Sequence, residues 1–110
     1  MHRLLAPLSA SLLSAMFLFT WVTAASAATM VAIANFTFDP PVVTVPAGTE
    51  VTWRNDDDIP HTVTAQDQSF SSDALDTGDQ YSMSFATPGT YTYFCALHPH
   101  MTAKVIVTGG

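Results

Sequence analysis

The sequence is poor in cysteine and in positive charge, and each shortage excludes a class of protein. It has one cysteine, Cys95, in 110 residues, which excludes a framework of internal disulfides. A single cysteine also argues against a structural zinc site, since such sites favour several thiolates. The chain has only three Lys and Arg residues against nine Asp and Glu residues. This balance argues against binding to nucleic acid or to an anionic membrane surface.

The N-terminal residues 1–27 have the pattern of a secretory signal peptide. Arg3 supplies a short positive region, residues 12–22 form an apolar run, and Ala25-Ser26-Ala27 matches a cleavage signal. The alternative is an uncleaved membrane anchor, but the run is short for a span of about 20 residues. We therefore expect an exported, periplasmic protein whose domain comprises residues 28–110, with no membrane attachment after cleavage.

The mature chain would have about 83 residues, which is enough for one small domain. Its only cationic side chains would be Arg54 and Lys104, giving a formal charge of about −7 against the nine carboxylates. A lone thiol is a liability in an oxidising compartment unless something occupies it, and a bound metal would do so. We expect this domain to be a monomer.

Short runs of alternating apolar and polar residues, separated by turn residues, favour strands over helices throughout the mature chain. The runs cover residues 30–38, 42–45, 49–54, 61–65, 80–85, 90–94 and 103–108. Only residues 71–75 have a weak helical pattern. Seven or so short strands in such a small domain predict an all-β fold, a Greek-key β-sandwich or small barrel.

The densest group of metal donors is the segment from Cys95 to Met101, which has the spacing C-x2-H-x2-M. A thiolate, an imidazole and a thioether at this spacing suit copper, and a second imidazole would complete a blue-copper set. His61 is the natural source of that imidazole. We predict that His61, Cys95, His98 and Met101 are the metal ligands. His98 would lie on the loop after Cys95, and Met101 just before the last strand.

Two other uses of the same residues fit the sequence less well. A catalytic zinc ion keeps an open position with ligand sets unlike Cys-His-His-Met. A cysteine hydrolase would need Cys95 paired with His61 or His98 as the base, in a domain too small for a substrate cleft. We therefore expect no enzymatic activity.

Four segments together resemble the cupredoxins: residues 51–55, Pro60-His61, residues 89–95 and residues 98–107. Within that family the short ligand loop is most similar to the loop of amicyanins, and the similarity covers residues 28–108. The resemblance implies an eight-stranded Greek-key sandwich with one type 1 copper ion. It also implies that the protein carries single electrons between larger redox proteins, such as a periplasmic dehydrogenase and a c-type cytochrome. A periplasmic copper carrier or storage protein, using the same ligands, is the alternative.

The loop also departs from the amicyanin pattern. Leu97 stands where those loops usually have a proline, and His100 stands where they have an aromatic residue. We expect His100 to face solvent rather than the metal. By resemblance, Asn55 and Thr62 are expected to make hydrogen bonds that tie the His61 segment to the Cys95 loop. The partner is left open by these departures.

Overall fold

The computed structural model of the protein describes residues 15–16, 18 and 29–109. The predicted signal peptide lies almost entirely outside these residues, as does its cleavage site. Within the described ranges, no helix is long and apolar enough to cross a bilayer.

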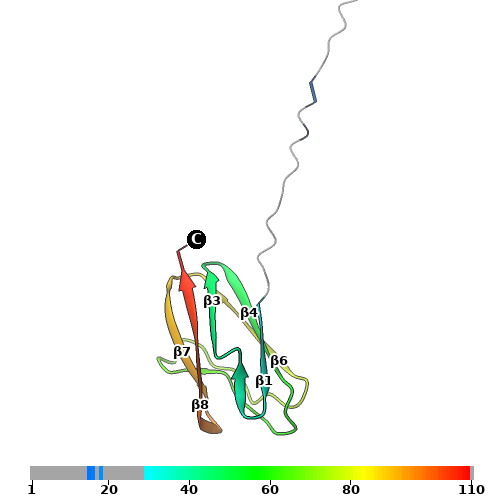
Figure 1. The fold of residues 1–110 in the computed structure, drawn as a ribbon, viewed down its shortest axis with the longest axis vertical. Coiled ribbons are helices and arrows are strands. Elements are labelled where there is room, and N and C mark those ends of the chain that lie inside the picture. The colour runs from blue at the N-terminus through cyan, green and yellow to red at the C-terminus, as the bar shows by residue number, and fades with distance from the viewer. Residues whose placement is uncertain (1–14, 17, 19–28, 110) are drawn as a thin grey trace, which may run out of the picture.

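The described part of the chain forms eight strands in two four-stranded sheets (Figure 1). The first sheet has the order β2-β1-β4-β6 and the second β3-β8-β7-β5. The strands are β1 (Thr29–Ala34), β2 (Thr37–Asp39), β3 (Val42–Pro46), β4 (Thr49–Asn55), β5 (Thr64–Ala65), β6 (Gln80–Phe85), β7 (Gly89–Cys95) and β8 (His98–Thr108). The prediction of an all-β sandwich is confirmed.

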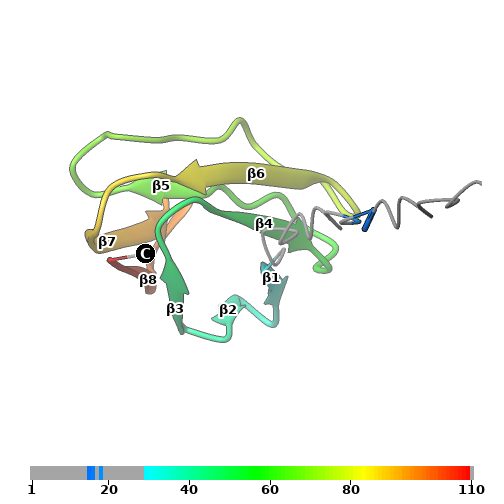
Figure 2. The ribbon, with the colours of Figure 1, turned by 90° about the horizontal axis from the view of Figure 1, so that it is seen from above.

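The chain changes sheet repeatedly, so both sheets enclose one core. The connection from β2 to β3 is the first such crossing (Figure 2). Strands β1 and β4 pair in parallel, as do β3 and β8, whereas β7 and β8 form an antiparallel hairpin. Alternating residues face inward, as in β3, where Val43 and Val45 are buried between exposed neighbours. The largest fully buried side chains are Trp53, Tyr93 and Phe85.

Two of the predicted strands differ in the structure. The run 30–38 divides into β1 and β2 because Asn35 and Phe36 both adopt positive φ and turn the chain back. Its apolar alternation continues across the turn because both strands bury residues in the same core. The run 61–65 is a strand only over Thr64–Ala65, since His61 makes a single bridge to Leu75 instead. Residues 71–75 contain no helix and bridge to the 61–65 segment at both ends.

The turn between β7 and β8 lies at the end of the sandwich opposite the C-terminus, and the turn between β1 and β2 lies at the same end (Figure 1). The β7–β8 turn has only two residues, Ala96 and Leu97. Strand β8 therefore begins at His98, and the prediction that His98 lies on a loop and Met101 precedes the strand was wrong. The hairpin is tighter than the sequence pattern indicated.

Candidate metal centre

Cys95 is the last residue of β7, and its free thiol is fully buried. Two contacts with Thr62 fix its position. The backbone N–H of Thr62 donates to Cys95 Sγ at 3.3 Å, and the Thr62 hydroxyl accepts a hydrogen bond from the Ala96 N–H at 2.7 Å. Thr62 thus ties the His61 segment to the Cys95 turn, as expected.

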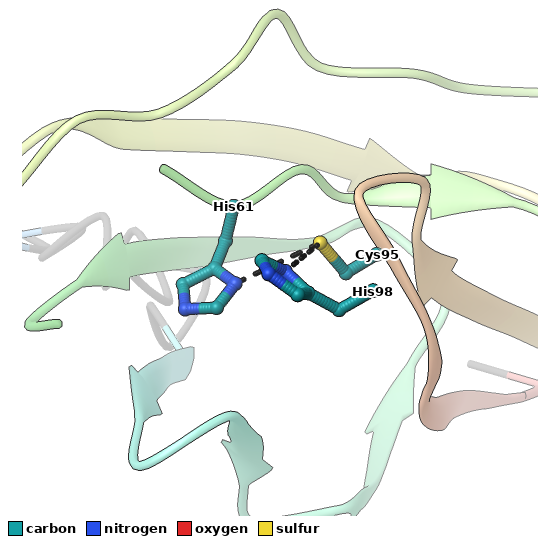
Figure 3. Close-up of side chains that lie close together, drawn as sticks. All are labelled: His61, Cys95 and His98. Carbon is teal, nitrogen blue, oxygen red and sulfur yellow. Dashed lines mark hydrogen bonds between the residues drawn. The ribbon is translucent and has the colours of Figure 1, made fainter. Parts of the chain in front are cut away.

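Two imidazoles converge on this sulfur (Figure 3). The Nδ1 atom of His61 lies 3.7 Å from Cys95 Sγ, and the Nδ1 atom of His98 lies 3.5 Å from it. The donor atoms of the three residues all lie within 4.8 Å of one another. His61 approaches from the segment before β5, whereas Cys95 and His98 are paired residues of the β7–β8 hairpin.

These distances fit a single bound metal ion. Bonds of about 2.1 Å to nitrogen and 2.3 Å to sulfur, at about 120°, would separate the two donors by about 3.8 Å. The two observed separations between Nδ1 and Sγ are close to this value. One soft thiolate and two imidazoles, held as a compact buried triangle, are the donors that copper favours. The residues therefore fit the implied metal.

Met101 is buried in β8 and is the fourth predicted donor. The pairing of β7 with β8 is interrupted by a bulge in β8. On β7 the paired residues Phe94 and Cys95 are adjacent, but their partners on β8, Thr102 and His98, are separated by three residues, Pro99 to Met101. This bulge re-aims the side chains along that stretch of β8. It leaves Met101 buried and His100 exposed, and the exposure of His100 is as expected. Pro99 fits such a position because it has no N–H to donate.

Asp57 is a site residue that the sequence did not single out. Its carboxylate accepts a hydrogen bond from His61 Nε2 at 2.8 Å. It also accepts the backbone N–H groups of Asn35 at 2.7 Å and of Phe36 at 3.0 Å. Desolvation alone would raise the pKa of Asp57, but these two N–H groups and the His61 ring together lower it. Asp57 is the middle residue of three aspartates, and nothing in the spacing distinguishes it from its neighbours.

The Asp57 contact decides which nitrogen of His61 faces the sulfur. His61 is fully buried, and its Nε2 N–H group donates a hydrogen bond to the carboxylate. The Nδ1 atom, which points at Cys95 Sγ, is the nitrogen left to bind a metal ion. A carboxylate behind a ligand histidine fixes the tautomer and orients the ring in this way in many metal sites.

Asn55 has a narrower role than expected. It is fully buried, and its side-chain N–H2 group donates to the carbonyl oxygens of Ile59 and Leu75, each at 2.8 Å. Its side-chain oxygen accepts the Asp57 N–H at 2.9 Å. Asn55 therefore shapes the loop that precedes His61, and it makes no hydrogen bond to the Cys95 turn, which Thr62 holds instead.

Comparisons with known proteins agree with the site. Residues 9–107 match the family model of the cupredoxin-like domain. The chain is 37% identical over 89 residues to amicyanin-alpha of Methylorubrum extorquens, covering 76% of this chain and 75% of that protein. It is 36% identical over 83 residues to the chloroplastic plastocyanin of Tetradesmus obliquus, covering 64% of this chain and 57% of that protein.

Solved structures give the same result. A purple cupredoxin from Nitrosopumilus maritimus superposes with a TM-score of 0.70 at 33% identity, covering 73% of this chain and 99% of that one. An oxidized amicyanin variant superposes with a TM-score of 0.70 at 31% identity, covering 76% of this chain and 85% of that one. Since the relatives are amicyanins and plastocyanins, the prediction that the protein is not an enzyme is confirmed. The set of His61, Cys95, His98 and Met101 is typical of a type 1 copper site. The family match and these relatives together show that the chain belongs to the cupredoxin family.

Proposed function

We propose that the protein is an exported, periplasmic type 1 copper protein that carries single electrons between redox proteins. The observation that supports this most strongly is the buried triangle of Cys95 Sγ and the two Nδ1 atoms of His61 and His98. These three residues and Met101 are the proposed ligands. Bound copper would supply a one-electron Cu(I)/Cu(II) couple.

The chain's own contribution is to hold these donors in one geometry. Cys95 is held by the Thr62 N–H, His61 by the Asp57 carboxylate, and His98 by its place beside Cys95 in a tight hairpin. Donors fixed in this way rearrange little when the charge on the metal changes. Small rearrangement favours fast electron transfer over release of the metal.

His98 is the proposed exit for electrons. It is partly exposed, whereas His61 and Cys95 are fully buried. Leu97, in the turn beside it, is 52% exposed, and so is Phe36, whose ring lies against His98. A small apolar surface around the exposed imidazole suits brief encounters with a periplasmic dehydrogenase or a c-type cytochrome. We propose that the protein acts as a monomer in these encounters.

A copper carrier or storage protein would use the same ligands, so the two functions must be separated by kinetics. The copper-loaded protein should be reduced and reoxidised through many cycles in the presence of a Cu(I) chelator. An electron carrier retains its copper and its visible absorption through these cycles. Loss of copper to the chelator at the first reduction would favour delivery and contradict electron transfer.

A further inference from the structure

Phe36 occupies a backbone conformation that disfavours it. Asn35 and Phe36 form the two-residue turn between β1 and β2, with φ values of 53° and 58°. A turn with two positive φ values favours asparagine at the first position and glycine at the second. Asn35 follows this preference, but a bulky side chain at the second position is a true outlier. Such outliers persist where the side chain has a use that the surroundings enforce.

The Phe36 ring lies against both proposed histidine ligands. Its centroid is 5.5 Å from that of His61 and 5.2 Å from that of His98, and it meets both rings edge-to-face, at 86° and 90°. The two imidazole centroids are themselves 4.9 Å apart. Phe36 is 52% exposed, so part of its side chain contacts the imidazole pair and the rest meets solvent. Aromatic pairs at these separations attract one another.

The same carboxylate that orients His61 also holds the Phe36 turn. Asp57 Oδ1 accepts the Asn35 N–H, and Asp57 Oδ2 accepts both the Phe36 N–H and His61 Nε2. The turn and the buried ligand are therefore fixed to one side chain, which is itself only 13% exposed. This arrangement leaves the Phe36 ring little freedom to move away from the imidazoles.

Phe36, whose ring contacts both imidazoles, also lines a surface groove. The groove has a volume of about 370 Å³, and Phe36, His100 and Met101 are among the residues that line it. Removal of the Phe36 ring would join this groove to the space beside His61 and His98. Water or a chelator would then reach the edge of the metal site.

We propose that Phe36 is a positioning residue that covers the two imidazoles and slows the loss of bound copper. The inference rests on the proposed copper site, since it concerns the retention of that metal. It assigns the disfavoured conformation of Phe36 a purpose: the ring keeps the histidine pair ordered and shields it from solvent.

The test is copper release from Phe36→Gly, because glycine suits the positive φ and removes the ring without straining the fold. We expect copper(II) transfer to excess EDTA to be about tenfold faster than in the wild type, the usual scale for groups that support metal ligands. Phe36→Tyr keeps an aromatic ring at this position and should release copper about as slowly as the wild type. Met30→Ala is the matched control, since Met30 is a 51% exposed apolar residue of β1, and it should release copper at the wild-type rate.

A second readout uses the metal-free protein. The side-chain NMR signals of His61 and His98 should broaden in Phe36→Gly, while its melting temperature stays equal to or above that of the wild type. Unchanged release and unchanged histidine signals in a folded Phe36→Gly would overturn the inference alone. A wild type that forms no blue copper complex would instead reject the proposed function.

Discussion

Removal of the Tyr93 hydroxyl should stabilise the protein. Tyr93 is fully buried, and neither its hydroxyl nor the Trp53 indole N–H makes a hydrogen bond of good geometry among the described residues. The two rings lie 5.4 Å apart at 81°. An unpaired buried hydroxyl destabilises a fold by about 1–3 kcal/mol, and the small void left by its removal offsets part of this. We expect Tyr93→Phe to raise the free energy of unfolding at pH 7 by about 1 kcal/mol. For a domain of this size, this corresponds to a rise in melting temperature of about 4–8 °C.

The advantage of Tyr93→Phe should grow at alkaline pH. Burial raises the pKa of Tyr93 to about 12, although the nearby Trp53 indole lowers it in part. An unfolded tyrosine ionises near pH 10, so above that pH the unfolded state loses its proton first and the wild type is destabilised. The loss begins near pH 10 and is about 1 kcal/mol at pH 11 and about 2 kcal/mol at pH 12.

Urea unfolding of the two metal-free proteins at pH 7 and at pH 10–11.5 measures both effects. The difference between Tyr93→Phe and the wild type cancels the titration of other groups. A Tyr93→Phe protein that is less stable than the wild type at pH 7, or whose advantage stays constant up to pH 11.5, would refute the reasoning.

Two further predictions concern the residues around the metal centre. Asp57→Ala removes the acceptor of the buried His61 Nε2, so we expect the metal-free protein to lose about 2 kcal/mol of unfolding free energy, the scale of a hydrogen bond to a charged group. Asp58→Ala, at an exposed neighbouring position, is the control and should change stability by less than about 0.5 kcal/mol; equal losses in the two variants would contradict the role given to Asp57. Electron transfer to a positively charged redox protein should slow as salt is added, because the acidic chain attracts such a partner over a distance that salt screens. A rate that is independent of ionic strength in stopped-flow mixing would exclude this attraction.

The sequence predicted the parts of the site that depend on local spacing. Cys95, His98 and Met101 stand within seven residues, and their donor chemistry is specific enough to indicate copper before any fold is known. The alternating strands likewise predicted a sandwich. His61 was found because it was the best remaining imidazole, and the structure brings it to the sulfur from 34 residues away.

The features that sequence reasoning missed depend on contacts between distant segments. The Asn35–Phe36 turn interrupts an apolar alternation that continues on both sides, and glycine, the usual signal for such a turn, is absent. Asp57 gains its role only because that turn, 21–22 residues earlier, folds against it. The bulge in β8 depends on pairing with β7, which spacing alone does not reveal.

The most direct test of the proposed copper site is the spectrum of the purified mature protein after addition of one equivalent of Cu(II). A thiolate bound to copper beside two imidazoles should give an intense visible charge-transfer band and an EPR signal with narrow copper hyperfine splitting. Cys95→Ser, which keeps a similar shape but removes the thiolate, should lose both. A colourless wild-type protein, or one whose copper signal is the same in Cys95→Ser, would contradict the account.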